Sequence, residues 1–183
     1  MREINKLRKL YKLKETYRRG RVGSRQESSA EHTWSCLMLA DYFLSKEAQL
    51  NRLKVYELLL YHDVVEIEAG DTSIIAQDRS KKTEKEQKAI TALKAQLPTA
   101  TWAKLDALFR EFEWAKTKEA KFAKAIDALE AVIHFLDYKE DWKGWNEQRV
   151  RGLYEERFRK FPEMRKAFEE IMGFCRKNHY FEQ

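Results

Sequence analysis

Apolar residues recur every three or four positions along most of the chain, which is the spacing of α-helices that bury one face. The clearest case is residues 117–141, whose apolar face consists of Phe122, Ile126, Leu129, Ile133 and Leu136. No stretch of useful length alternates between apolar and polar residues, as a half-exposed strand does. The pattern therefore predicts an all-α protein, a helical bundle.

Capping residues and helix breakers set the expected helix boundaries. The segment SSAE at residues 28–31 has the Ser-x-x-Glu form of a capping box, so a helix begins at Ser28. Asn51 and Thr117 are suitable caps for later helices, and Pro98 and Pro162 separate neighbouring helices. We expect helices at about 2–17, 28–46, from 51 through the His-Asp pair at 62–63, 82–96, 100–114, 117–141, 145–160 and 163–177, with a loop at 67–81.

Length and composition agree with one helical domain. The chain has 183 residues, with only six glycines and two prolines, and we expect a single domain over residues 1–183. No apolar run approaches the ~20 residues of a membrane span, and the start MREINKLRKL lacks the features of a secretory signal. Cys36 and Cys175 lie far apart without a metal-type spacing, which favours a reducing, cytoplasmic setting.

The positive charge is concentrated at the N-terminus. The chain carries a net +6, and residues 1–25 alone hold ten Lys and Arg residues against two acids, a local +8. A local excess indicates a solvated helix face or a site for a small anion, and makes nucleic acid an unlikely partner. The arginines nearest the first histidine segment are the best candidates for the anion site: Arg18, Arg19, Arg21 and Arg25.

Two histidines and two aspartates form a candidate metal-binding set. The adjacent pair His62-Asp63 ends an apolar run, where such groups need a partner, and His32 lies in the first turn of the capped helix. Asp127 is flanked on its helix stripe by small residues, which permit close approach. An aspartate paired with a lysine would also fit there, but the combination favours a metal. Mixed imidazole and carboxylate ligands suit Mn, Co, Fe, Ni or Zn.

A metal with open positions is well suited to the hydrolysis of a phosphate ester, because it activates water and neutralises phosphoryl charge. Glu66 lies three and four residues beyond the His-Asp pair, so it is a candidate for orienting or deprotonating the water. Asp71 could protonate the leaving alkoxide or hold a substrate hydroxyl. The upstream arginines could clamp phosphate.

Taken together, the motifs RQESSAEHTW, HDVVEIEAGD and EFEWAKTKEAKFAKAIDALE resemble the HD-domain metal-dependent phosphohydrolases, in particular their 5′-deoxynucleotidase branch. The resemblance covers about residues 5–140 and leaves the C-terminal helices, about 145–178, without a motif. It implies an α-helical HD fold and the hydrolysis of 2′-deoxynucleoside 5′-monophosphates. It also implies a cytoplasmic homodimer and an activity that cobalt, manganese or copper supports.

The same resemblance assigns roles to individual residues. It implies one transition metal held by His32, His62, Asp63 and Asp127. Glu66 matches the catalytic carboxylate of the family, and Asp71 a substrate-contacting acid. Glu113 matches an acid near the pocket, and Arg18 is the best match to a phosphate-binding arginine, with Arg19 and Arg21 as alternatives.

Two other functions remain open at this point. An HD-type hydrolase could instead cleave a nucleotide phosphodiester or an alarmone-like nucleoside polyphosphate. The basic N-terminal segment could also belong to a non-catalytic module that binds RNA or an acidic partner, although the chain has none of the usual nucleic-acid-binding motifs.

Overall fold

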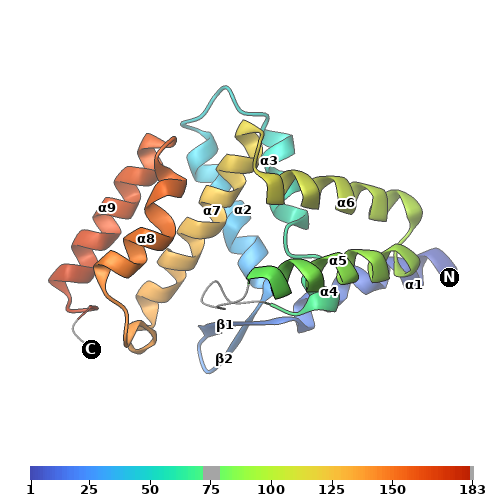
Figure 1. Ribbon diagram of the computed structural model, residues 1–183, viewed down its shortest axis with the longest axis horizontal. Helices are drawn as coiled ribbons and strands as arrows, with labels where there is room; N and C mark the ends of the chain where they lie inside the picture. The colour runs from blue at the N-terminus through green and yellow to red at the C-terminus, as the bar shows by residue number, and fades with distance from the viewer. Residues whose placement is uncertain (72–78, 182–183) are drawn as a thin grey trace.

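The computed structural model describes residues 1–71 and 79–181 and confirms the all-α class (Figure 1). In chain order the elements are α1 (Arg2–Leu7), the 3₁₀ helix η1 (Arg8–Glu15), β1 (Tyr17–Val22), β2 (Arg25–Ser28), α2 (Ser29–Leu44), α3 (Arg52–Tyr61), α4 (Glu66–Ala69), α5 (Arg79–Gln96), α6 (Thr99–Trp114), α7 (Lys118–His134), the 3₁₀ helices η2 (Phe135–Asp137) and η3 (Lys139–Trp142), α8 (Glu147–Phe158) and α9 (Pro162–Lys177). Helix α7 contacts α2, α3, α6, α8 and α9, and therefore forms the centre of the bundle.

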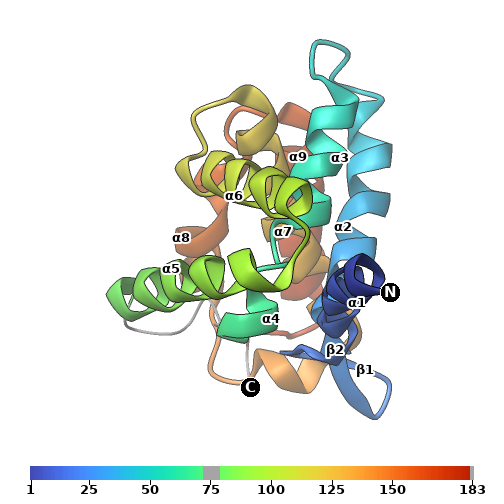
Figure 2. The same cartoon turned by 90° about the vertical axis from the view of Figure 1, so that its right-hand side faces the viewer.

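The core is organised around the apolar face of α7. Phe122, Ile126 and Leu129 are fully buried against the surrounding helices. Burying each such side chain contributes about 1.5–3 kcal/mol to stability. A second apolar cluster, which includes Leu93 of α5, lies among α5, α6 and η1, on the side of the molecule that Figure 2 shows. Tyr61, at the end of α3, packs against both clusters and joins them.

The N-terminal segment differs from its prediction. In place of one helix over residues 2–17, α1 is followed by η1, and the chain then forms an antiparallel β-hairpin. The hairpin pairs Tyr17 with Ser28 and Val22 with Arg25, and Gly23 adopts a φ of +61° in its turn. Its strands are rich in arginine and show no alternation of apolar residues, so the sequence pattern gave no sign of a sheet.

The predicted helix caps are confirmed. The Ser28 hydroxyl accepts a hydrogen bond from the amide of Glu31, and the Glu31 carboxylate accepts one from the amide of Ser28. Asn51 and Thr117 cap α3 and α7 in the same way, each through a side-chain oxygen. The capping box fixes where α2 begins and thereby places His32 in its first turn.

The third helix ends earlier than predicted. Helix α3 stops at Tyr61. In a continuing helix the carbonyl of Leu59 would accept a hydrogen bond from a backbone amide. Here the Nδ1–H of the His62 side chain donates a 2.6 Å hydrogen bond to that carbonyl instead. The chain then turns, and the amide of Glu66 bonds to the carbonyl of Asp63 as α4 begins. The predicted loop at 67–81 is thus shortened at both ends by α4 and α5, and its part at 72–78 lies outside the described residues.

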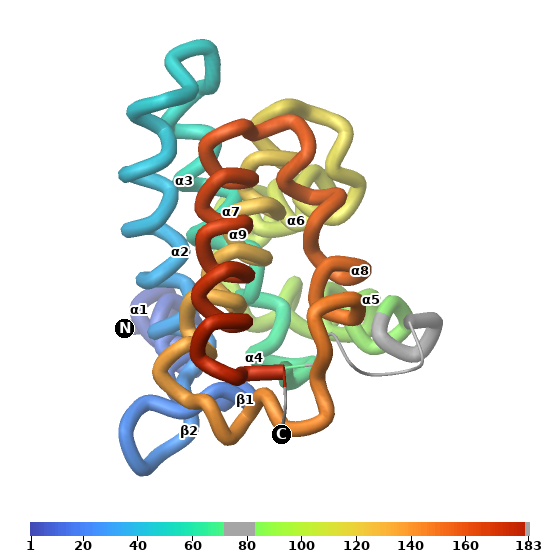
Figure 3. The backbone as a smooth tube through the Cα atoms, turned by 90° about the vertical axis from the view of Figure 1, so that its left-hand side faces the viewer, coloured from blue at the N-terminus to red at the C-terminus, as the bar shows by residue number. Residues whose placement is uncertain are grey.

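The long helix also ends early, at His134 in place of Asp141, and two 3₁₀ turns follow. Side chains from later in the chain bind the carbonyls there: the indole of Trp142 donates to Phe135, and the hydroxyl of Tyr180 donates to Leu136. The two predicted C-terminal helices are confirmed as α8 and α9, which stand together at one end of the bundle (Figure 3). Within the described ranges, no helix could cross a membrane.

Candidate active site and metal centre

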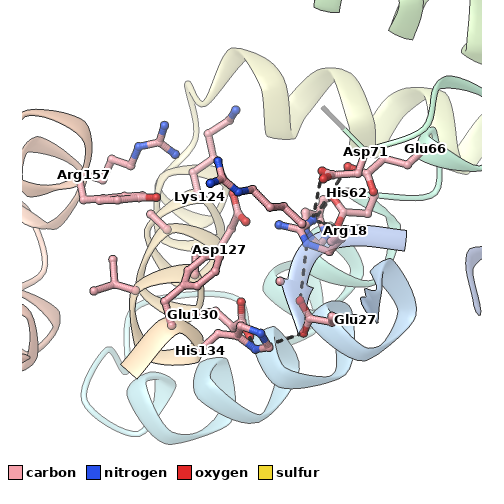
Figure 4. A pocket seen from close by; sticks show the side chains of 18 of the residues that line it. Arg18, Glu27, His62, Glu66, Asp71, Lys124, Asp127, Glu130, His134 and Arg157 are labelled. Atoms are coloured by element: carbon pink, nitrogen blue, oxygen red, sulfur yellow. Dashed lines mark hydrogen bonds and ion pairs between the residues drawn. The ribbon is translucent and has the colours of Figure 1, made fainter. Parts of the chain in front are cut away.

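The structure brings the four predicted metal ligands together from three separate parts of the chain. His32 comes from the first turn of α2, His62 and Asp63 follow α3, and Asp127 lies in the middle of α7. The Nε2 atom of His32 lies 3.2 Å from Asp127 Oδ1 and 3.9 Å from Asp63 Oδ2. The Nε2 atom of His62 lies 3.1 Å from Asp63 Oδ1. Figure 4 shows the wall that carries His62 and Asp127.

Hydrogen bonds to Nδ1 of the two imidazoles determine which ring nitrogen is left to bind a metal ion. Nδ1 of His32 donates to the Glu130 carboxylate at 2.6 Å, and Nδ1 of His62 donates to the Leu59 carbonyl. When it is neutral, each ring therefore has its lone pair on Nε2, which faces carboxylate oxygens. Nε2 of His62 is buried and has no hydrogen-bond partner among the described residues. Lone pairs facing carboxylates require a cation between them, so these residues fit a divalent metal ion.

The electrostatics of the cluster lead to the same conclusion. Burial of His32 disfavours its charged form, yet Cys36 and Asp127 raise its pKa well above the ordinary value. Burial likewise opposes ionisation of Asp127, but the His32 hydrogen bond and the nearby His62 hold the pKa of that carboxyl far below its usual range. The carboxylates thus favour a positive charge at this point, which either a proton on Nε2 of His32 or a metal ion in its place supplies.

Cys36 is a neighbour of the cluster that the sequence did not indicate as a ligand. Its sulfur lies 3.5 Å from Nε2 of His32, and its ligand atom is within 4.8 Å of those of His32, His62 and Asp127. The side chain is fully buried, and burial raises the pKa of its thiol to about 12. As a neutral thiol it is a poor ligand beside the two imidazoles and the carboxylates.

A cavity of about 480 Å³ opens beside the cluster. Among the described residues, nine carboxylates and four cationic side chains line it. An anionic substrate would be repelled by such a surface unless positive charge entered with it, which again favours a bound metal ion. The volume falls in the range typical of small-molecule sites.

Glu66, Asp71 and Arg18 form one charged group at the cavity wall. Nη1 of Arg18 lies 3.0 Å from Asp63 Oδ2, and about 4 Å from the carboxylates of Glu66 and Asp71. Burial opposes the charge on Arg18, but these acids hold its pKa above the ordinary value. Burial, with Asp63 and Asp71 nearby, raises the pKa of Glu66 well above its usual range, although Arg18 and the hydrogen bond from Ser29 oppose that rise.

The other predicted substrate-binding residues are placed differently. Arg19 is exposed and lines the cavity, as does Glu113, whose carboxylate accepts a hydrogen bond from Lys124. Arg21 is not among the described residues that line the cavity. Its guanidinium is instead bound by Asp141 at 3.1 Å and Glu140 at 3.2 Å, at the end of the hairpin. The predicted assignment of Arg21 to substrate therefore has no support in the geometry.

Several residues of the site were missed in the sequence. Glu130 orients His32, and it lies near the buried Glu27 and the half-buried His134. Lys124 and Arg157 line the other side of the cavity. Glu130 could have been found because it is a charged residue inside the apolar run ALEAVIHFL. A polar pair at the end of an apolar run was the signal that identified His62 and Asp63. Nothing in the sequence around Arg157 distinguishes it from its exposed neighbours.

Known proteins are similar to this chain in sequence and in fold. The 5′-deoxynucleotidase HDDC2 of Xenopus laevis is 32% identical over 117 residues, which is 62% of this chain and 56% of that protein. The human HDDC2 is 29% identical over 120 residues, 63% of this chain and 56% of that protein. The chain therefore spans a little over half the length of the curated relatives it matches.

A solved structure is similar over nearly the whole chain. A protein from Magnetospirillum magnetotacticum, described as a predicted metal-dependent phosphohydrolase, is 28% identical, with a TM-score of 0.80 over 98% of this chain and 94% of that one. The family model for the HD domain matches residues 10–171, which include all four predicted metal ligands. The chain belongs to the HD domain family.

Proposed function

We propose that this protein is a metal-dependent phosphomonoesterase that hydrolyses deoxynucleoside or nucleoside 5′-monophosphates to nucleoside and phosphate. The observation that carries the proposal is the convergence of two Nε2 lone pairs and two carboxylates beside a cavity. The named activity of the HDDC2 relatives supports the substrate class. The family fold supports the reaction class.

In this proposal the metal would be held by His32, His62, Asp63 and Asp127. A bound divalent ion supplies charge neutralisation at the phosphoryl oxygens and a water of lowered pKa. The identity of the ion is not fixed by this ligand set, which suits Co, Mn, Cu, Zn, Ni or Fe.

The protein's own groups would complete the chemistry. Glu66, with its raised pKa, is suited to accept a proton from the attacking water near neutral pH. Arg18 faces the same point and would exchange part of its contact with Asp63 for a phosphate oxygen. Asp71, 3.9 Å from Arg18, is placed to hold a sugar hydroxyl or protonate the leaving oxygen, while Arg19 and Glu113 would contact the rest of the nucleotide.

A nucleotide panel with metal add-back tests the proposal. The protein is stripped with a chelator, dialysed, and assayed for phosphate release from deoxy- and ribonucleoside 5′-monophosphates with Mn²⁺, Co²⁺, Cu²⁺ or Zn²⁺. We expect release only after a metal is restored. Turnover that survives both chelation and Asp63→Ala would exclude this mechanism. Activity confined to a phosphodiester or a nucleoside polyphosphate would replace the substrate class.

Glu130→Gln tests whether the hydrogen bond from His32 to Glu130 strengthens metal binding. The glutamine keeps the shape but loses the charge that orients Nδ1 of His32 and strengthens Nε2 as a ligand. We expect metal affinity, measured by competition with a chromophoric chelator, to fall roughly 10- to 100-fold. Glu170→Gln, which changes an exposed acid of α9, should leave the affinity as it is. Equal affinities in the two variants would contradict the role of Glu130.

The remaining expectations are also proposals. We propose a single HD domain, a cytoplasmic location and a homodimer, as the family resemblance implies. Sedimentation of the purified protein would decide the last of these.

A further inference from the structure

The wall of the cavity away from Arg18 carries a second group of cations. Figure 4 shows Lys124 and Arg157 on the opposite side of Asp127 from Arg18 and Asp71. Lys124 belongs to α7, and Arg157 belongs to α8, so this side of the cavity is built in part by α8. The phosphate chemistry proposed above uses neither residue.

Arg157 is half-buried at the cavity wall, and no hydrogen bond or ion pair joins it to any other described residue. The acids closest in sequence bind other arginines: Glu156 pairs with Arg159 at 3.0 Å, and Glu155 pairs with Arg151 at 3.3 Å. A partly desolvated guanidinium without an acceptor is unfavourable unless an anion arrives from outside.

Lys124 lies on the same helix as Asp127, one of the proposed metal ligands. It precedes Asp127 by three residues on α7, a rise of about 4.5 Å along the helix axis, so both side chains face the cavity. Its ammonium group binds Glu113 at 2.9 Å and lies 4.7 Å from the centre of the Phe112 ring. These contacts hold the ammonium group at the cavity wall, and it still has donor capacity for a ligand.

Tyr154 completes this corner. It lies one turn before Arg157 on α8, lines the cavity and is 7% exposed. Burial and then Asp127 raise the pKa of Tyr154, while Arg157 and Arg18 lower it. The phenol therefore lies close enough to Asp127 and to the Arg157 guanidinium to feel their charges. As a neutral group, it can donate a hydrogen bond to an anion.

We propose that Lys124 and Arg157, with the hydroxyl of Tyr154, form a second anion-binding subsite that holds a second phosphate group of the substrate. The inference rests on the function proposed above for the metal centre. Its simplest ligand is a nucleoside 3′,5′-bisphosphate, whose 5′-phosphate is hydrolysed with water while the 3′-phosphate stays on the product. Two phosphates at opposite ends of one nucleotide match one cavity with cations at opposite walls.

A comparison of matched ligands tests the subsite. Binding of 2′-deoxyadenosine 5′-monophosphate and 2′-deoxyadenosine 3′,5′-bisphosphate is measured by calorimetry in chelator, and KM is measured after Mn²⁺ is restored. We expect the bisphosphate to be favoured by roughly tenfold or more in both measurements, as charge-assisted hydrogen bonds predict. In Arg157→Gln and Lys124→Gln, this preference should fall toward one. A 5′-diphosphate arm shows whether the second phosphate must be on the sugar; a stronger preference for it would overturn the 3′ assignment.

The control is Arg159→Gln, two residues along at the same end of α8 and exposed. If the only role of Arg157 were to interact with the dipole of α8, Arg157→Gln and Arg159→Gln would have the same effect on the preference for the bisphosphate. We expect Arg159→Gln to keep the preference and Arg157→Gln to lose it.

The outcomes separate the two proposals. Hydrolysis of the monophosphate with no preference for the bisphosphate, or a preference that survives Arg157→Gln, overturns the subsite and leaves the phosphatase. An Arg157-dependent preference in binding, with no phosphate released from either nucleotide, supports the subsite and removes the proposed reaction. Binding of neither nucleotide overturns the subsite.

Discussion

Replacing His62 with alanine is expected to remove metal from the protein and to lower phosphate release by at least two orders of magnitude. The reason is geometric: Nδ1 of His62 is held by the Leu59 carbonyl, so Nε2 is fixed in the cluster with its lone pair available. Losing an outer-shell partner of a metal ligand usually costs 10- to 100-fold, so losing a ligand costs more. Metal content after dialysis and kcat/KM with added Mn²⁺ measure the two effects.

His179→Ala is the matched control for that experiment. His179 is exposed near the C-terminus and lies outside the cluster of potential ligands. Its replacement should leave both metal content and turnover unchanged. If His62→Ala retained stoichiometric metal, the cluster would not be the metal site, whatever the effect on turnover. Metal lost with turnover preserved would mean that the reaction needs no ion.

Local sequence signals were sufficient for most of the fold and for the expectation that His32, His62, Asp63 and Asp127 lie close together. The capping box at Ser28 and the caps Asn51 and Thr117 depend only on neighbouring residues, and the structure forms all three. The apolar period of α7 predicted the central helix in the same way. The grouping of the four proposed metal ligands followed from chemistry, because imidazole and carboxylate groups in apolar surroundings need a common partner.

The errors occurred where distant contacts override local pattern. Helix α7 was predicted to reach Asp141, but Trp142 and Tyr180 take the carbonyls beyond His134. The hairpin at 17–28 has few apolar residues. Its buried Gly20 packs so close to His134 that a side chain there would collide with the imidazole at 2.8 Å. None of these pairings is visible in a window of neighbouring residues.

The same limit explains which site residues were missed. Glu130 acts on His32 from 98 positions away in the chain, and the proposed role of Arg157 depends on its having no hydrogen bond or ion pair with the other described residues. The sequence favoured Arg18 and kept Arg21 as an alternative, and strand geometry directs Arg18 to Asp63 and leaves Arg21 beside Asp141. A cluster of like residues therefore shows where a charged site lies without showing which members enter it.

Glu66→Gln is expected to lower kcat by about 10²- to 10⁴-fold while metal content stays at the wild-type level, because the variant removes a proton acceptor and keeps the ligands. It should also change the pH profile. Burial and Asp63 raise the pKa of Glu66, so its proton-accepting form appears only as pH rises through a value above that of an ordinary carboxylate. The wild-type rate should therefore climb with pH across that range, and the variant should lose this rise.

Glu68→Gln provides the comparison, because Glu68 lies on the same short helix, is exposed and pairs with Lys9. It should keep the wild-type kcat and pH profile. A structural role of Glu66 through its hydrogen bond with Ser29 would lower the melting temperature of Glu66→Gln and leave the shape of the pH profile intact. A proton-accepting role alters the profile with little change in melting temperature. An unchanged profile in Glu66→Gln would therefore assign the proton transfer to another group, and Asp71, on the same side of Arg18, would be the next residue to replace.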